Sequence, residues 1–313
     1  MKSTAKLLAA LALPALSLIL SQTASAWTTK LACQGGATGA QVAQGSATGQ
    51  WTNAFTLMKY STTQVPTGST QSCQLGVAGG TDGWDQWGGI YQFPSHLTSG
   101  SNLWIRLAMY VPAGFNYTAN PWLKFIRVHT ASPSNANMGY NDLYINPAGG
   151  SVWDQTLSKQ ITAPFAYYYE SQGDVRAVGT SANSIAAGKW ETYELHYTID
   201  TKSKNQGGVG EVKIWKNNAL IADLTDQLQL ADATTYVESF YLFTYWNGNA
   251  PATQQLYVDD VTITTDTPSN KDAAGNAFIG APVLAGSAGT SSGGGTTTTG
   301  TPVPNPPANV TVQ

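Results

Sequence analysis

Arginine and histidine stand two residues apart in the segment LKFIRVHT, residues 123–130, and this pair can bind an anion and move a proton. In a β-strand the side chains alternate between two faces, so we expect Phe125, Arg127 and His129 on one face and the β-branched residues between them on the other. An arginine binds a carboxylate or sulfate through two hydrogen bonds. An imidazole titrates near pH ~6.5 and can accept a proton. We therefore expect Arg127 and His129 to share an open groove, as anion clamp and general base.

Two further segments carry cations and aromatic rings at the same alternating spacing. LWIRLAMYV, residues 103–111, places Arg106 between aromatic residues, opposite a row of aliphatic side chains. FYLFTYWNGN, residues 240–249, places Tyr245 in a second aromatic row. A tyrosine with a pKa of roughly 10 becomes a usable proton shuttle when a neighbouring arginine lowers that pKa. We expect Arg106 and Arg127 to hold the anion and Tyr245 to supply a proton.

Further residues lie on the same expected face or beside it. Lys124 is one position off the favoured face, near a strand end, and is a candidate substitute base. His196 shares its strand face with Glu194, which either orients it or only pairs with it. Each candidate also has an ordinary alternative: a solvated face for the arginines, a structural role for the histidines and an aromatic ladder for the tyrosines. The full candidate set is catalytic Arg127, His129, Tyr245 and Arg106, and substrate-binding Trp104, Tyr110, Lys124, Phe125, Tyr140, Asn141, His196, Tyr241 and Asn247.

Other kinds of site have weak support in the sequence. Glycoside hydrolysis needs two carboxylates flanking one bond, whereas Glu191 and Glu194 fall on opposite faces of their expected strand. Histidine or cysteine pairs at metal-ligand spacing are absent, as are a G-x-S-x-G turn and a phosphate loop. We expect no cofactor and no metal in the site, and a structural calcium held by Asp259 or Asp260 stays an open alternative.

The first 26 residues have the pattern of a secretory signal peptide. Two lysines precede an apolar run that is too short for a comfortable membrane span, and A-S-A at 24–26 is a cleavage site. We expect an exported bacterial protein, secreted or periplasmic, with no membrane span. Cys33 and Cys73 are the two cysteines of the chain. In an oxidising compartment we expect them to form a disulfide, with two free buried thiols as the alternative.

Composition and strand spacing predict an all-β protein. Charged residues make up 11% of the chain, which also has 10 Trp and 15 Tyr, and few charges with many aromatic and β-branched residues favour strands. Short alternating segments recur between residues 51 and 265, which predicts a two-sheet antiparallel β-sandwich. The formal net charge of -3 argues against a nucleic-acid partner. We expect a monomer.

The composition changes after residue 265. Residues 27–286 are expected to form one β-jelly-roll domain with an irregular C-terminal tail. Residues 287–306, rich in Gly, Ser, Thr and Pro, read as a linker. Residues 307–313 resemble the start of a fibronectin type III module.

Three blocks of sequence resemble the concanavalin A-like jelly-roll family of polysaccharide lyases. They are GGIYQFPSHLTSGSNLWIRLAMYVPAGFNYT, GKWETYELHYTID with the following GEVKIWKNNALI, and YLFTYWNGNAPATQQLYVDDVTI. The resemblance implies a jelly roll and β-elimination on alginate, glucuronan, heparin-like or ulvan chains. The R-V-H of 127–129 stands where one alginate lyase family has Q-I-H, and Tyr245 aligns with the catalytic tyrosine of that family. The chain departs from this family because the R-T-E-x-R motif is absent and Phe243 replaces the lysine of the tyrosine strand.

The sequence therefore leads to a first hypothesis of an exported lyase acting on an anionic, uronic-acid-containing polysaccharide. A non-catalytic carbohydrate-binding or adhesive module is the main alternative, because the same aromatic groove would serve it. A glycoside hydrolase whose carboxylates meet only in the fold is a third and weaker reading.

Overall fold

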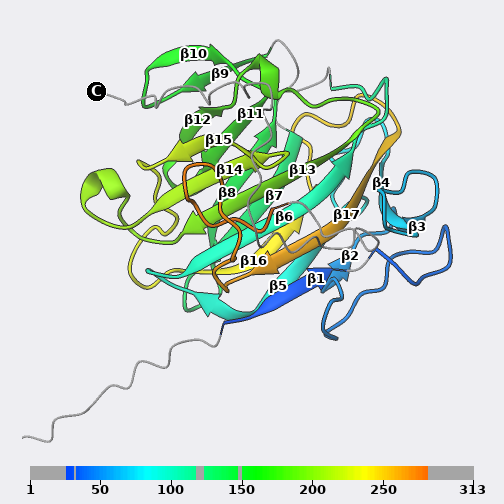
Figure 1. The fold of residues 1–313 in the computed structure, drawn as a ribbon, viewed down its shortest axis with the longest axis horizontal. Helices are drawn as coiled ribbons and strands as arrows, with labels where there is room; N and C mark the ends of the chain where they lie inside the picture. Colours follow the sequence, from blue (N-terminus) through cyan, green and yellow to red (C-terminus); the bar gives the residue numbers. More distant parts are fainter. Residues whose placement is uncertain (1–25, 32, 118–122, 147–149, 281–313) are drawn as a thin grey trace, which may run out of the picture.

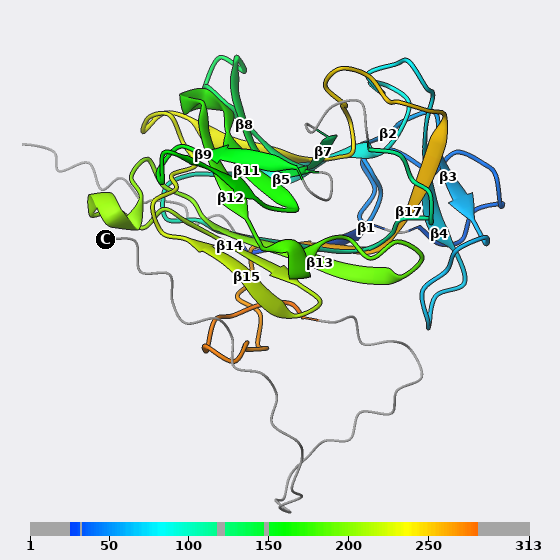
Figure 2. The ribbon, with the colours of Figure 1, turned by 90° about the horizontal axis from the view of Figure 1, so that it is seen from above.

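Two antiparallel sheets packed face to face make up the molecule in its computed structural model (Figure 1). The structure describes residues 26–31, 33–117, 123–146 and 150–280. The expected signal peptide, apart from Ala26, lies outside the described residues, as do the linker and the fibronectin-like stub. Figure 2 shows the two layers edge-on, with β7 and β8 in one layer and β13 and β17 in the other. The predicted all-β, two-sheet sandwich of the jelly-roll type is confirmed.

One layer is an 8-stranded sheet in the order β15-β14-β13-β6-β17-β4-β3, with β1 also paired to β17. Its long central strands alternate aliphatic and polar residues, so one face enters the core and the other faces outward. Its strands are β1 (Thr28–Leu31), β3 (Met58–Ser61), β4 (Ser72–Val77), β6 (Asn102–Tyr110), β13 (Trp190–Thr198), β14 (Glu211–Lys216), β15 (Ala219–Leu224) and β17 (Gln254–Thr264).

The other layer is a 7-stranded sheet in the order β12-β11-β8-β7-β16-β5-β2. Its strands are β2 (Asn53–Ala54), β5 (Gly89–Leu97), β7 (Leu123–Ala131), β8 (Asn137–Ile145), β11 (Phe165–Tyr169), β12 (Asp174–Val178) and β16 (Tyr236–Leu242). A separate hairpin is formed by β9 (Ser151–Asp154) and β10 (Lys159–Thr162), and short 3-10 turns lie at η1 (Glu170–Gln172), η2 (Ser181–Asn183) and η3 (Lys204–Gln206). No helix of the described residues has the length and apolar character needed to span a bilayer.

The core lies between the two sheets and is formed by the alternating apolar side chains of both. Leu103, Ile105 and Leu107 of β6 are fully buried in it, opposite β7 residues such as Ile126 and Val128. Burying each such side chain stabilises the fold by about 1.5–3 kcal/mol. The sandwich therefore presents its remaining polar side chains on two outer faces, one on each sheet.

The asparagine pair in GEVKIWKNNALI predicts a tight hairpin, and the structure has one at Asn217 and Asn218. These two residues join β14 to β15 with φ of 48° and 66°. Both lie in the left-handed region, which asparagine tolerates better than most residues and which two-residue hairpin turns require.

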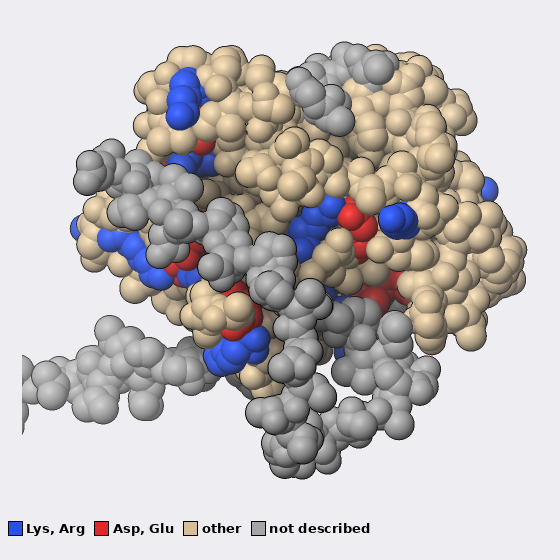
Figure 3. All heavy atoms as spheres, turned by 45° about the horizontal axis from the view of Figure 1, so that its top comes forward, with Lys and Arg blue, Asp and Glu red and all other residues tan. Residues whose placement is uncertain are grey.

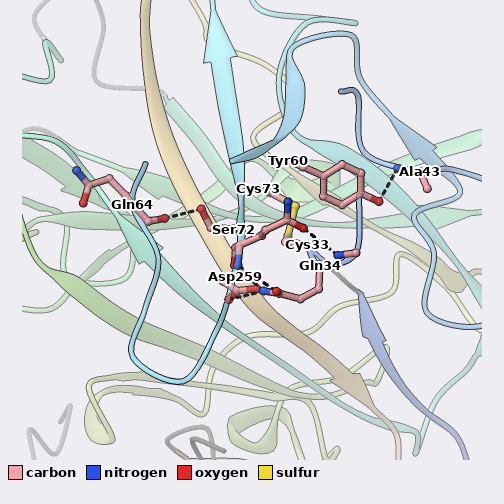
Figure 4. Close-up of a disulfide and its surroundings, with 10 residues drawn as sticks. Cys33, Gln34, Ala43, Tyr60, Gln64, Ser72, Cys73 and Asp259 are labelled. Carbon is pink, nitrogen blue, oxygen red and sulfur yellow. Dashed lines mark hydrogen bonds between the residues drawn. A yellow bond between two sulfur atoms is a disulfide. The ribbon is translucent and has the colours of Figure 1, made fainter. Parts of the chain in front are cut away.

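The predicted disulfide between Cys33 and Cys73 is confirmed (Figure 4). Cys73 belongs to β4, and the bond joins it to the segment that follows β1. Next to the bond, the Gln34 side chain donates hydrogen bonds to the Gln71 carbonyl at 2.5 Å and to Asp259 of β17 at 3.3 Å. The N-terminal segment is thus fastened to the sheet by a covalent bond and by polar contacts.

Residues 266–280, here called the strap, lie across the outer face of the 8-stranded sheet (Figure 2, orange). Glu194 of β13 accepts hydrogen bonds from the backbone N–H groups of Ile279 at 2.5 Å and Gly280 at 3.0 Å. The Trp104 indole donates to the Ala277 carbonyl at 3.1 Å. Burial under the strap raises the pKa of Glu194 to about 7. The strap therefore covers one part of this outer face.

Candidate functional site

The outer face of the 7-stranded sheet carries a group of cations and tyrosines, here called the tyrosine face. Strand β7 supplies the cations and lies between β8 and β16, which supply most of the rings. The strand register places His129 opposite Tyr140 and Arg127 opposite Tyr241. The tyrosine face consists of Lys124, Arg127, His129, Tyr140, Tyr144, Tyr241 and Tyr245.

Arg127 is held by a carboxylate and a ring. Its Nε donates to the two carboxylate oxygens of Asp142 at 3.1 and 3.2 Å. Its guanidinium carbon lies 3.6 Å from the centre of the Tyr140 ring, a cation–π stack. Burial disfavours the charge of Arg127, but Asp142 outweighs burial and holds the pKa of the guanidinium above its usual value. The side chain is therefore a fixed cation, and only 3% of its surface is exposed.

Both ring nitrogens of His129 are engaged. Nδ1 lies 2.9 Å from a carboxylate oxygen of Glu238, and Nε2 lies 3.1 Å from Oδ1 of Asn137. That same Oδ1 accepts the backbone N–H of Gly139 at 2.8 Å, which identifies it as the oxygen of the amide. Each ring nitrogen thus faces an acceptor, and this pattern suits an imidazolium that donates from both nitrogens. The contacts favour His129 as a second cation of the tyrosine face and not as a free base.

Lys124 lies on the tyrosine face because β7 contains a β-bulge. Pairing with β8 shifts between Lys124, opposite Tyr144, and Ile126, opposite Leu143. The bulge turns Lys124 to the same side as Arg127, although three positions separate them. Its Nζ lies 5.0 Å from the centre of the Tyr245 ring. Burial, and then the nearby positive charge of Arg127, lower the pKa of Lys124.

Tyr245 reaches the tyrosine face through a break in the alternation after β16. Phe243 has a φ of 46°, in the left-handed region, and its side chain turns into the core against Trp87 and Phe125. Strict alternation would place Phe243 on the same face as Tyr241 and Tyr245, and this prediction is wrong. The Tyr245 carbonyl accepts the backbone N–H of Lys124 at 3.2 Å, which fixes the two residues side by side.

Two further rings of the tyrosine face, those of Tyr140 and Tyr144, are held as neutral phenols. The rings of Tyr140 and Tyr241 pack edge to face with centres 5.4 Å apart. Burial, followed by the neighbouring Tyr241, raises the pKa of Tyr140 above its usual value. Burial, followed by Asp142, raises the pKa of Tyr144 in the same direction. These hydroxyls can donate hydrogen bonds at neutral pH but do not act as bases.

Two predicted substrate-binding residues point into the core and are corrected. Phe125 is fully buried and packs edge to face on Tyr193 with ring centres 5.2 Å apart, because the bulge in β7 breaks its alternation with Arg127. Asn141 is fully buried between Tyr167, whose hydroxyl donates to it at 2.8 Å, and the Gln229 carbonyl. Both side chains therefore have structural roles.

Four predicted site residues belong to the other sheet. Arg106 lies on the outer face of β6 and pairs with Asp260 of β17 at 2.8 Å, so it cannot join Arg127 across the sandwich. Trp104 stacks on His196 with ring centres 4.2 Å apart, near the strap. Tyr110 lies at the other end of β6 on that same face. Alternation was correct for these strands, but it cannot show which sheet a strand joins.

The sequence reasoning missed the partners of the cations. Asp142 and Glu238 were not predicted as site residues, although they hold Arg127 and His129. The alternation of Tyr140, Asp142 and Tyr144 in YNDLY was the available signal for Asp142. Asn247 lies in the turn after Trp246, where its buried Oδ1 accepts no hydrogen bond from the described residues.

Charged side chains are sparse, and several opposite charges lie side by side. Figure 3 shows one side of the molecule, on which several lysine and arginine atoms lie next to aspartate or glutamate atoms. The described ranges contain no cluster of three or more histidine, cysteine, aspartate or glutamate side chains arranged to hold a metal ion. Asp260, one of the two residues considered for calcium, is paired with Arg106.

Comparison with known proteins finds similarity in structure but not in sequence. No protein-family model matches the chain, and no curated protein matches it. Among solved structures, an endo-β-1,4-glucuronan lyase from the fungus Trichoderma reesei is 12% identical with a TM-score of 0.46, covering 67% of this chain and 87% of that one. An alginate lyase from Chlorella virus is 13% identical with a TM-score of 0.46, covering 67% and 90%. An alginate lyase from Aplysia kurodai is 13% identical with a TM-score of 0.45, covering 67% and 87%.

Polysaccharide lyases of jelly-roll type are thus among the structural neighbours of the chain. At this level of identity and TM-score, the similarity carries neither a substrate nor a reaction over to it. The chemistry of the tyrosine face has to supply any argument about function.

Proposed function

We propose that the protein is a polysaccharide lyase that cleaves a uronic-acid-containing polysaccharide by β-elimination on the tyrosine face. The observation that carries the proposal is the placement of Lys124, an amine with a lowered pKa, against the Tyr245 ring on the face that also holds Arg127 and His129. A proton acceptor, a proton donor and fixed cations are the three requirements of this reaction.

The elimination needs these groups for definite steps. A base removes the proton from C5 of the uronate, and the electron pair of that C–H bond forms a double bond between C4 and C5. The bond from C4 to the glycosidic oxygen breaks, and an acid protonates the departing oxygen. Negative charge accumulates on the uronate carboxylate in the transition state, and fixed cations in a water-poor site stabilise that charge.

Lys124 and Tyr245 fit the two proton-transfer roles. A lysine is a base only when it is neutral, and burial beside Arg127 lowers the pKa of Lys124 toward the range where it can act. The Tyr245 phenol lies beside it and can donate to the leaving oxygen. This assignment replaces the predicted base His129, since both of its ring nitrogens already face acceptors.

Arg127 and His129 fit the role of carboxylate recognition. The Arg127 Nε is occupied by Asp142, and its two terminal nitrogens are the groups that would approach a uronate. His129, when protonated, adds a second positive charge next to Tyr140 and Tyr241. The rings of these two tyrosines offer faces or edges on which the apolar side of a sugar can pack. We further propose that the protein works outside the cytoplasm, where its disulfide is stable.

A panel of polyuronates tests the proposal. Purified protein is mixed with alginate, glucuronan, ulvan and glycosaminoglycans, and the ultraviolet absorbance of unsaturated sugar ends is followed. The proposal expects absorbance to rise with at least one of these substrates and to fall sharply in Tyr245→Phe, which keeps the ring and removes the hydroxyl. Reducing ends that form without ultraviolet absorbance would indicate hydrolysis and contradict it.

A non-catalytic carbohydrate-binding module is the second candidate, and one observation favours it. The cations Arg127 and His129 are paired with Asp142 and Glu238 and are only 3% and 8% exposed, so much of their charge is already satisfied. On this reading the tyrosine face binds a sugar chain but does not cleave it. Binding to a polyuronate without any product, and with unchanged affinity in Lys124→Met, would favour this candidate.

A further inference from the structure

A row of polar and aromatic side chains crosses the outer face of the 8-stranded sheet, on the opposite side of the sandwich from the tyrosine face. The strand register aligns Lys59 of β3, Gln74 of β4, Tyr257 of β17, Tyr110 of β6 and Trp190 of β13, each opposite the next. The chain neighbours of the first four point into the core, and Trp190 lies at the start of β13 opposite Tyr110. We call these five residues the outer row.

Hydrogen bonds through the Gln255 side chain and contacts between rings link four of the five members of the outer row. The Gln74 amide donates to the Gln255 side-chain oxygen at 2.9 Å, and the Gln255 amide donates to the Tyr257 hydroxyl at 2.9 Å. The Tyr257 ring packs edge to face on the Tyr110 ring with centres 6.1 Å apart. The centres of the Tyr110 and Trp190 rings lie 5.7 Å apart. The Tyr257 ring is only 2% exposed and holds its neighbours in place, so the Gln74 and Gln255 amides and the half-buried Tyr110 and Trp190 rings are already positioned for a ligand.

A hollow of about 310 Å³ lies at one end of this row. Its lining includes Lys59, Gln74, Gly76 and Gln255. Gly76 pairs with Gln255 across the strands and has no side chain, and a Cβ placed there would lie 3.4 Å from the Leu57 side chain. A glycine inside a strand marks a position where another group can approach the backbone closely. The hollow is large enough to be compared with small-ligand sites, which start at about 300 Å³.

We propose that the outer row and its hollow bind a neutral glycan chain. Side-chain amides both donate and accept, as sugar hydroxyls do, and Gln74 Oε1 accepts no hydrogen bond from the described part of the chain. Tyr110 and Trp190 are half-buried and offer aromatic surface next to those amides. A sugar could therefore place its hydroxyls on the glutamines and its apolar face on the rings.

Charge selects the neutral class of ligand. Lys59 is the one charged residue among those lining the hollow in the described structure. A polyuronate carries a carboxylate on every sugar and would need several cations, which the tyrosine face has and the outer row lacks. The strap, whose hydrogen bonds include those to Trp104, Glu194 and Trp215, makes none to the outer row in the described residues. The outer row would hold the protein on a neutral glycan whether or not the tyrosine face cleaves a polyuronate.

Affinity electrophoresis tests this proposal without reference to cleavage. The protein is run through gels containing β-glucan, xyloglucan, arabinoxylan or galactomannan, with alginate and glucuronan gels alongside. We expect at least one neutral glycan to retard the protein. We expect the double variant Gln74→Ala/Gln255→Ala to weaken that retention about tenfold, the loss of two ordinary hydrogen bonds.

Three comparisons make the result decisive. Gln160→Ala, at an exposed position of β10, is the matched control and should be retained like the parent protein. Tyr110→Ala tests the aromatic contribution, and the glutamine variants keep the test valid if this variant does not fold. Three outcomes would overturn the proposal: no retention by any neutral glycan, equal retention of the double variant and the control, or an effect of the double variant on polyuronates alone.

Discussion

Acid should destabilise the fold through His196, and the size of the effect follows from its surroundings. The ring stacks on Trp104 with centres 4.2 Å apart and an angle of 9° between planes. Its Nε2 lies 2.9 Å from Oδ1 of Asn102. Burial, followed by the positive charge of Lys213, lowers the pKa of His196 to about 3 from an ordinary value of 6.5. The folded protein therefore holds this imidazole neutral where the unfolded chain protonates it.

The sign and magnitude follow from proton linkage. Because the unfolded state binds the proton more tightly, stability from His196 is complete above pH ~6.5 and is lost progressively as the pH falls toward ~3. If the whole lowering of the His196 pKa is counted, the free energy of unfolding at pH ~5 falls by about 2 kcal/mol. The ring is partly exposed, so solvent screening reduces this figure, and we expect a loss of about 1–2 kcal/mol.

The assay compares the parent protein with His196→Phe. Phenylalanine keeps a ring against Trp104 but cannot titrate, and Asn102 Oδ1 still accepts the Thr198 hydroxyl. Free energies of unfolding from urea titrations at pH ~5 and ~7.5 give the pH-dependent loss for each protein. The parent should lose about 1–2 kcal/mol more than the variant between these two values. Equal losses in the two proteins would refute the reasoning, because every other titratable group is common to both.

Three further substitutions have defined outcomes. Replacing Cys33 and Cys73 together by alanine should lower the free energy of unfolding by about 4 kcal/mol, since the bond closes a loop with a sequence separation of 40, and an unchanged urea midpoint would contradict this. Gly88→Ala should lower the free energy of unfolding by more than about 3 kcal/mol, because the new Cβ would lie 1.7 Å from the Leu242 carbonyl oxygen. Gly100 has a similar positive φ but open space around it, so Gly100→Ala should lower that free energy by only about 1 kcal/mol. Glu194→Ala should cost about 1–3 kcal/mol and speed protease cleavage within the strap, because two backbone N–H groups lose their acceptor, and parental cleavage rates would count against the described strap contacts.

The strands, the hairpin turn and the disulfide could be predicted from the sequence because each depends on a short stretch of residues or on one residue type. Alternation along β6 and β13 correctly separated core residues such as Leu107 and Leu195 from outward ones. The positive φ of Asn217 and Asn218 and the disulfide also followed from residue type and compartment. These features depend on a few neighbouring residues or on one chemical preference, so a single sequence contains enough information to predict them.

The candidate site depended on two things that alternation cannot supply. The bulge in β7 places Lys124 on the tyrosine face and Phe125 in the core. After β16, the left-handed conformation of Phe243 turns its own ring into the core. Sheet membership is the second: Arg106 and Arg127 occupy similar positions in their strands but belong to opposite layers. Asp142 and Glu238 were missed for a related reason, since pairing of β8 and β16 with β7 brings them to the cations.

The most direct test of the account is the rate at which unsaturated ends form on the best polyuronate substrate, measured for two variants against the parent protein. The account predicts that Lys124→Met lowers the rate by about 100-fold or more, the usual loss when a general base is removed. His129→Gln should lower it much less, and Lys159→Met, at an exposed position of β10, should leave it unchanged. A Lys124→Met variant that keeps the parental rate, or a His129→Gln variant that loses more, would contradict the assignment of Lys124 as the base.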